Sequence, residues 1–219
     1  MLKLLLAVIF MLAWAPPAVA VSGLEQVWFH VPTQYKISEK TSLIGDISPR
    51  LSADGGVDQN IVRSGIQRKL TRNLNGTLGF DVVDNFTPTR NHENRLWQQL
   101  QLQRKKGSYT LSARLRVEER HFTGKDGESI RARLMLKSSQ RIQATKFSVV
   151  YYDELFLTLN TIPGGPVQGV DRNRLFGGIG YSIDRNKTLE CGYRVEYINK
   201  TDVDDETRRQ IVIQLASLF

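Results

Sequence analysis

Residues 110–120 read TLSARLRVEER, a run in which apolar and polar side chains alternate strictly at first. The apolar positions are Leu111, Ala113, Leu115 and Val117. Arginine, serine and glutamate fill the positions between them and after them. Successive side chains of a β-strand point to opposite faces, so this segment predicts a strand with one apolar face and one charged face.

The same period of two recurs along the chain, for example in 186–199 and 207–219. It predicts eleven candidate strands: 24–37, 41–52, 57–70, 73–85, 92–104, 108–122, 129–139, 145–160, 171–183, 187–199 and 205–219. After the first twenty residues, no segment has the 18 or more consecutive apolar residues of a membrane-spanning helix. An all-β fold is therefore expected.

The links between these strands alternate in length. The short links are 38–40, 71–72, 105–107, 140–144 and 184–186. The longer links are 53–56, 86–91, 123–128, 161–170 and 200–204. Short turns on one rim, longer loops on the other and long strands are typical of outer-membrane barrels. The sequence thus favours an antiparallel, up-and-down transmembrane β-barrel, with apolar side chains outward and charged side chains enclosed.

A soluble alternative remains open on the same pattern. A periplasmic sandwich or ligand-binding barrel would place the apolar face inside and the charges in water. The first twenty residues and the last predicted strand both favour the membrane barrel. Residues 1–20 combine Lys3, an apolar run over 4–14 and the tripeptide Ala18-Val19-Ala20, the pattern of a cleaved secretory signal peptide. Residues 21–219 would then form a single barrel domain.

The last predicted strand ends on an aromatic residue, Phe219. An alternating strand with a terminal aromatic looks like the signal that the bacterial barrel-assembly machinery recognises. We therefore expect two partners, that machinery and outer-membrane lipid, and a location in the bacterial outer membrane.

The number of strands presents a difficulty, because single-chain bacterial barrels usually have an even number. Eleven candidates fit only if 24–37 is an irregular segment outside the wall, giving ten strands, or if two strands have been merged elsewhere, giving twelve. We expect ten, with twelve as the alternative. Three aromatic residues of the first segment, Trp28, Phe29 and Tyr35, would then suit an interfacial belt.

Five stretches together resemble a family of bacterial outer-membrane proteins known as domain of unknown function 2490. They are HENRLWQQ at 92–99, RLRVEER at 114–120, YYDELF at 151–156, NRLFGGIGY at 173–181 and Gly192-Tyr193. Their order and spacing cover most of 21–219. The resemblance implies an outer-membrane barrel of unassigned activity, and it supplies no catalytic residues.

The charged faces of the predicted strands collect the candidate site residues. These are Glu93, Arg95, Arg114, Arg116, Glu118, Arg120, Arg131, Arg133, Glu154, Arg172, Arg174, Glu190, Arg194 and Glu196. Arginine binds carboxylates through a planar fork, so a structural network that fills the barrel is one interpretation. The other is a narrow polar or anion-preferring channel or pocket that takes a small anionic solute, since arginine commonly lines anion pores.

Composition excludes several other classes. The single cysteine excludes a disulfide framework, and three scattered histidines argue against a metal centre. The formal charge of +8 does not favour nucleic acid, because basic and acidic residues share the same faces. We expect no cofactor and no metal.

We also expect no enzyme activity, although a lipid-modifying enzyme is the alternative of a different class. Its base would be His30, His92 or His121 on the outer wall, and its nucleophile a serine: Ser42, Ser112 or Ser138. The sequence has no Gly-x-Ser-x-Gly motif. The glycine-rich run 176–180 lacks the Lys-Ser/Thr of a phosphate loop, so we expect it to make room for a large neighbouring side chain.

Overall fold

The computed structural model describes residues 25–86, 90–200 and 204–219. The expected signal peptide, 1–20, lies outside these residues. The described chain forms one sheet of twelve strand segments. They are β1 (Gln26–His30), β2 (Thr33–Lys36), β3 (Thr41–Ser52), β4 (Val57–Lys69), β5 (Leu74–Asn85), β6 (Asn91–Lys106), β7 (Tyr109–Phe122), β8 (Glu128–Arg141), β9 (Phe147–Thr158), β10 (Gly169–Ser182), β11 (Lys187–Ile198) and β12 (Glu206–Leu218).

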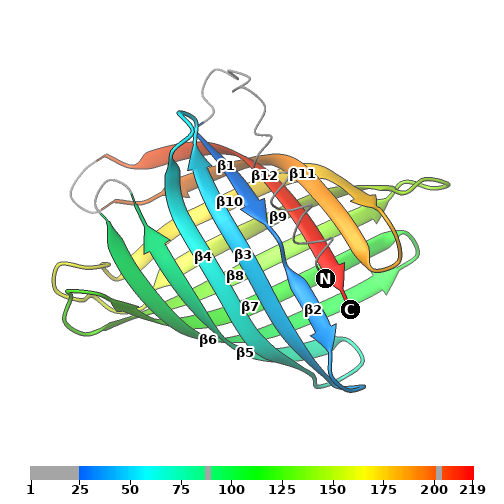
Figure 1. Ribbon diagram of the computed structural model, residues 1–219, viewed down its shortest axis with the longest axis horizontal. Helices are drawn as coiled ribbons and strands as arrows, with labels where there is room; N and C mark the ends of the chain where they lie inside the picture. Colours follow the sequence, from blue (N-terminus) through cyan, green and yellow to red (C-terminus); the bar gives the residue numbers. More distant parts are fainter. Residues whose placement is uncertain (1–24, 87–89, 201–203) are drawn as a thin grey trace.

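The sheet closes on itself to form a barrel (Figure 1). From β3 to β12, each strand pairs antiparallel with the next along the chain. Closure is different, because β1 and β2 lie between β12 and β3. Both segments run antiparallel to β3 and parallel to β12. The barrel is therefore of mixed pairing, which corrects the expectation of a purely antiparallel wall.

β1 and β2 occupy a single position in the wall. Gln26 pairs with Gln210 of β12, and Thr33 pairs with Ser217, so the register is the same in both segments. The interruption falls at Val31 and Pro32. Proline has no N–H to give to the ladder, so a break at this point is expected. Twelve strand segments thus make a closed barrel of eleven strand positions.

The expected number of ten strands was therefore wrong, and so was the reason for it. The expectation places 24–37 outside the wall because single-chain bacterial barrels usually have an even number of strands. The chain closes with a parallel pair instead, so 24–37 is part of the wall. The alternative was twelve strands, obtained if two strands had been merged elsewhere. The structure does have twelve strand segments, but the additional segment comes from the break in this first strand.

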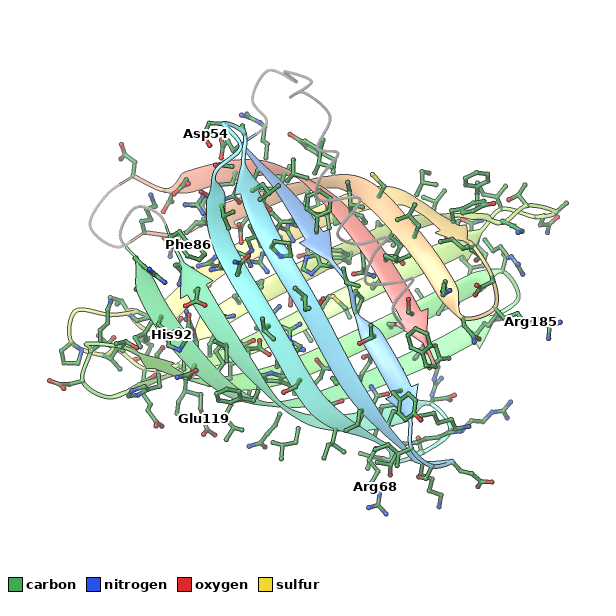
Figure 2. The ribbon with its side chains drawn as sticks, viewed as in Figure 1. Asp54, Arg68, Phe86, His92, Glu119 and Arg185 are labelled. Atoms are coloured by element: carbon green, nitrogen blue, oxygen red, sulfur yellow. The ribbon has the colours of Figure 1, made fainter. Side chains whose placement is uncertain are left out.

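The two faces of the wall have opposite chemistry. Leu111 and Leu115 of β7 are 58 % and 48 % exposed on the outside, whereas Arg116 and Glu118 are 3 % and 0 % exposed. The other strands repeat this arrangement, with leucine, isoleucine, valine, tyrosine and phenylalanine outside and charged or amide side chains buried (Figure 2). The expected orientation, with apolar side chains outward and charges enclosed, is therefore what the strands adopt. In the described part of the chain, no helix is long and apolar enough to cross a membrane.

The two rims differ in their links. Asp54, Phe86 and His92 lie near the rim with the longer links, and Arg68 and Arg185 lie at the rim with the short links (Figure 2). We call these the long-link rim and the short-link rim. Exposed aromatic side chains gather at the short-link rim: Tyr35, Tyr109, Phe147 and Phe219.

One predicted member of an aromatic belt is inside the barrel. Trp28 is 1 % exposed and packs with Val150, Phe176 and Val212. The prediction for Trp28 was wrong because β1 is a wall strand, and its alternate side chains point inward.

Glycines make room for the large interior rings. A Cβ at Gly79 would overlap the ring of Trp97, which is its cross-strand neighbour on β6. A Cβ at Gly178 would overlap the ring of Phe176, and that ring stacks on Tyr152 with 4.8 Å between centroids. The expected role of the glycine-rich run is thus confirmed at Gly178, whereas Gly177 faces open space.

Candidate functional site: the charged interior of the barrel

All the sequence-predicted site residues point into the barrel. Three of them, Arg114, Arg172 and Glu190, are half-buried, and the rest are buried. They are brought together by ion pairs that link neighbouring strands and also cross the interior. The structure therefore assembles them into connected networks with several carboxylates at their centres.

Glu118 of β7 is one of two fully buried carboxylates among the predicted site residues, together with Glu196. Its Oε2 accepts from Arg131 Nη2 at 2.6 Å, and its Oε1 accepts from Arg133 Nη1 at 2.6 Å. Arg116 Nη1 lies 3.7 Å from Oε1. A fully buried carboxylate is costly unless it is paired and hydrogen-bonded, and three arginines meet that requirement here.

Glu154 and Glu196 extend the network around the barrel. Glu154 Oε1 accepts from Arg133 Nη2 at 2.7 Å and from Arg114 Nη2 at 2.5 Å. Glu196 Oε1 accepts from Arg174 Nε at 2.6 Å. Because Arg174 Nη1 also lies 3.8 Å from Glu154 Oε2, the two carboxylates are joined through one guanidinium.

Two further groups sit beside this network. Glu93 binds Arg95 through two parallel hydrogen bonds of 2.6 and 2.8 Å, and its Oε1 also accepts from Arg120 Nε at 2.6 Å. Asp81 binds Arg63 in the same bidentate way, at 2.8 Å for each bond, and accepts from Trp97 Nε1 at 2.6 Å. Bidentate pairs fix both partners geometrically, so these side chains are held rigidly.

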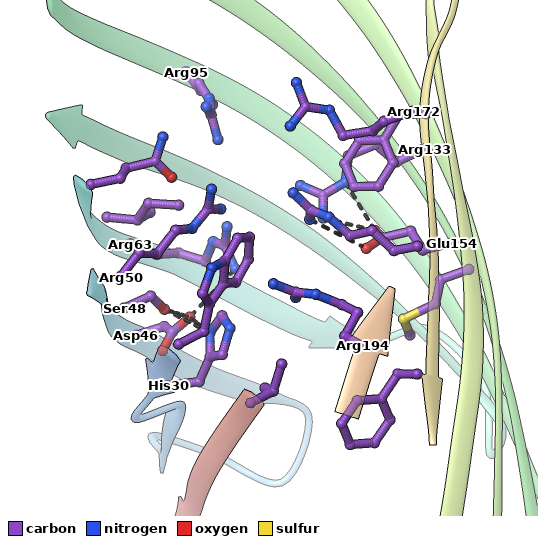
Figure 3. Close-up of a pocket in the computed structure, with 18 of the residues that line it drawn as sticks. His30, Asp46, Ser48, Arg50, Arg63, Arg95, Arg133, Glu154, Arg172 and Arg194 are labelled. Atoms are coloured by element: carbon purple, nitrogen blue, oxygen red, sulfur yellow. Dashed lines mark hydrogen bonds and ion pairs between the residues drawn. The ribbon is translucent and has the colours of Figure 1, made fainter. Parts of the chain in front are cut away.

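A serine, a histidine and an aspartate meet on the inner faces of β1 and β3 (Figure 3). Ser48 Oγ lies 2.7 Å from His30 Nδ1 and 2.8 Å from Asp46 Oδ2. Asp46 Oδ2 approaches the same nitrogen, Nδ1, at 3.6 Å. In a hydrolase triad, the nucleophile and the aspartate contact opposite nitrogens of the imidazole, so this cluster has a different geometry.

The serines and histidines of the enzyme alternative are distributed over both faces of the wall. Ser42 is buried inside the barrel, whereas Ser138 lies on the outer face, where its cross-strand neighbours are Leu111 and Tyr151. Gln34 Nε2 donates to Ser42 Oγ at 3.0 Å. His92 pairs with Asp84 at 2.9 Å near the long-link rim. Among the described residues, no ion-ligating group of three or more histidine, cysteine or acidic side chains is found.

Trp28 holds two arginines against its ring. The Cζ of Arg50 lies 3.2 Å from the ring centroid, and the Cζ of Arg194 lies 3.4 Å from it. The indole Nε1 donates to Gln26 Oε1 at 3.0 Å, which fixes the ring. Cation–π contact of this kind partly replaces the hydration that a buried guanidinium loses.

Cavities follow one another through the barrel. A central cavity of about 600 Å³ is lined by eleven arginines and Lys137 against four carboxylates, namely Asp46, Glu93, Glu154 and Glu190. Towards the long-link rim, a second cavity of about 350 Å³ shares Arg50, Gln59, Asn85 and Arg208 with it. The lining of the central cavity is thus strongly basic.

Towards the short-link rim lies a larger cavity of about 870 Å³, which we call the vestibule. Its wall combines small polar side chains, among them Ser112, Ser139 and Ser148, with charged ones, among them Arg141 and Lys146. It shares Gln101, Met135, Lys137 and Glu190 with the central cavity. Lys137 Nζ binds both oxygens of Glu190, at 2.9 and 2.7 Å, and this ion pair spans from β8 to β11 at the boundary between the two spaces.

Several interior residues were missed by the sequence reasoning. They are Asp46, Arg50, Arg63, Asp81, Lys137, Asp171 and Gln210. The signal for them was present, because Asp46, Ser48 and Arg50 alternate with Ile47 and Pro49 in the predicted strand 41–52. Extending the inner-face parity to every strand would have included all of them except Asp171, which points inward beside Arg172 at an irregularity in the strand register.

A search of curated proteins finds no match to this chain. Residues 25–207 match the family model described as "Protein of unknown function (DUF2490)". This segment covers all the strands that carry the ionic networks, from β1 to the start of β12. The chain therefore belongs to the DUF2490 family of proteins of unknown function, the family that its sequence resembles.

Proposed function

We propose that this protein is an outer-membrane β-barrel that lets small anions pass through its interior. The outer face supports the membrane part of the proposal. Large apolar side chains are exposed on nearly every strand, and a closed barrel leaves no unpaired sheet edge in hydrocarbon. The aromatic side chains at the short-link rim suit the boundary between lipid and water.

One observation carries the anion part of the proposal. Three cavities that share lining residues follow one another along the barrel, and the central one carries twelve basic side chains against four carboxylates. A basic lining in a surround of low dielectric attracts anions and repels cations. A solute that enters at either rim would therefore be selected by charge in the central cavity.

The membrane part is tested by fractionation of cells that express the full sequence. We expect the protein in the outer-membrane fraction, with a gel mobility that changes on heating because the folded barrel resists detergent. Recovery of unaltered protein in the periplasmic extract would contradict this location and would favour a soluble carrier.

The anion part is tested with purified protein in planar lipid bilayers. We expect small single-channel currents and, in a gradient of potassium chloride, a reversal potential with the sign of chloride preference. An absence of conductance would favour an interior that only stabilises the barrel. A cation preference would contradict the proposed role of the arginines.

A further inference from the structure

Two arginines of the central cavity differ from the others in their surroundings. Arg50 of β3 and Arg194 of β11 both lie within 3.4 Å of the ring centroid of Trp28. Two guanidinium groups at that distance would overlap on one face, so they occupy opposite faces of the indole. Figure 3 shows them approaching from opposite sides of the pocket. Trp28 is almost fully buried, so neither contact is made at the surface.

Neither arginine has an ion-pair partner among the described residues. Their guanidinium nitrogens have no carboxylate within 4.0 Å there, unlike those of Arg95, Arg131 or Arg133. The nearby carboxylate of Glu196 is already engaged by Arg174. Arg194 is buried and Arg50 is half-buried, and positive charges in such positions without an ion-pair partner are costly, which favours binding of a counter-charge.

One guanidinium nitrogen of each arginine is buried and has no hydrogen-bond partner among the described residues. Arg194 Nε donates to Gln210 Oε1 at 2.6 Å, but its Nη2 is buried without a partner. Nε of Arg50 is likewise buried without a hydrogen-bond partner. Gln210 in turn donates to Gln26 Oε1 at 2.8 Å, which ties Arg194 and Trp28 into one fixed frame. The donors are therefore held in position before any ligand arrives.

We infer that Arg50 and Arg194 form a binding site for a small divalent oxyanion, an inference that names the anion class and rests on the proposed function for its biological role. Two uncompensated charges match a divalent anion better than a monovalent one. Planar guanidinium groups favour oxyanions, because each can give two parallel hydrogen bonds to a pair of oxygens. Both arginines line the central cavity, and Arg50 also lines the cavity at the long-link rim, which supplies an entry route.

The test is calorimetric titration of the detergent-solubilised protein with inorganic phosphate at constant ionic strength, above the second pKa of phosphate. We expect saturable binding near one equivalent, and weaker binding of chloride. Arg50→Gln and Arg194→Gln should each weaken phosphate binding by about tenfold or more, since each removes charge-assisted hydrogen bonds. Arg50→Lys keeps the charge and should weaken it less than Arg50→Gln.

Arg120→Gln is the matched control. It removes one positive charge from the lining of the same cavity, but Glu93 retains its bidentate bonds to Arg95. We expect a loss of affinity below about threefold in this variant, because the charge removed was already compensated. Heat-modifiable mobility of every variant shows that the barrel has formed.

The outcomes separate the site from the proposed function. Absence of saturable phosphate binding, or an equal loss in Arg120→Gln and Arg50→Gln, overturns the site even if anion-selective currents are seen. Saturable binding that depends on Arg50 and Arg194 supports the site even if bilayers show no conductance, in which case only the channel is contradicted.

Discussion

The two halves of the barrel interior are built from the same strands but from different side chains. Strand β6 shows the contrast: near the long-link rim its inward residues are Glu93, Arg95 and Trp97, and towards the short-link rim they are Gln99, Gln101 and Gln103. Strand β7 changes likewise, from Glu118 and Arg120 to Ser112. We refer to these as the ionic half and the vestibule half.

The difference shows how the interior of one barrel can be filled by long side chains in one half and left more open in the other half. Long arginines and tryptophans reach across the interior of the ionic half, where carboxylates hold them in place. In the vestibule half, short serines and threonines stand between the charged side chains, and its cavity has the largest volume of the three. Passage of a solute would therefore be controlled in the ionic half, while the vestibule would only admit it.

The largest expected effect is a difference in the free energy of unfolding between two variants. Each variant neutralises one carboxylate, the first in the ionic half and the second in the vestibule half. Glu118→Gln keeps the size of the side chain but leaves Arg131 and Arg133 facing a neutral amide, so we expect a loss of about 3–5 kcal/mol in the free energy of unfolding. Glu190→Gln removes the partner of one half-buried lysine, Lys137, and should cost about 1 kcal/mol or less. Urea unfolding of the protein in lipid vesicles, followed by tryptophan fluorescence, measures both. Equal losses would show that the two halves do not differ in this way.

A smaller effect is expected from adding one methyl group in each half. Gly79→Ala would push against the ring of Trp97, which its bond to Asp81 holds in place, and we expect a loss of about 1–3 kcal/mol. Gly180→Ala would meet the hydroxyl of Ser148 at the vestibule, and that side chain can rotate away, so we expect less than about 1 kcal/mol.

The same unfolding measurement compares these variants, and Gly177→Ala is the control because nothing lies near its added Cβ. A Gly180→Ala variant as unstable as Gly79→Ala would mean that the vestibule is as tightly packed as the ionic half.

The smallest expected effect concerns the boundary between the halves and depends on the proposed function. Replacing both Lys137 and Glu190 by serine removes an ion pair that crosses the interior without changing the net charge. We expect single-channel conductance to rise roughly twofold with the sign of ion preference unchanged, because selection stays in the arginine-rich part. The readout is the current in planar bilayers, and an unaltered conductance would show that the narrowest point lies elsewhere.

Much of the wall could be predicted from the alternation of side chains, because a period of two assigns each residue to one face. The candidate strand 41–52 coincides with β3, and all fourteen candidate site residues point inward. The closure could not be predicted in this way. Pairing of β1 with β12 joins residues 184 positions apart, as in Gln26 with Gln210, and no local pattern carries that information.

The ion-pair partners of the interior side chains could not be predicted from the sequence either. Lys137 meets Glu190 across two intervening strands, and Arg131 meets Asp171 across one. Such contacts depend on the curvature of the closed wall, which brings non-neighbouring strands to face one another. Inward orientation thus follows from parity, whereas the choice of ion-pair partner follows from the tertiary structure.

The parallel pairing of β1 with β12 has a consequence for the sidedness of the chain. Glu25 lies at the long-link rim and Phe219 at the short-link rim, whereas an even, wholly antiparallel barrel brings both ends to the same rim. If the barrel spans a membrane, epitope tags placed at these two positions would be displayed in different compartments. Antibodies applied to intact cells would then detect one tag and miss the other.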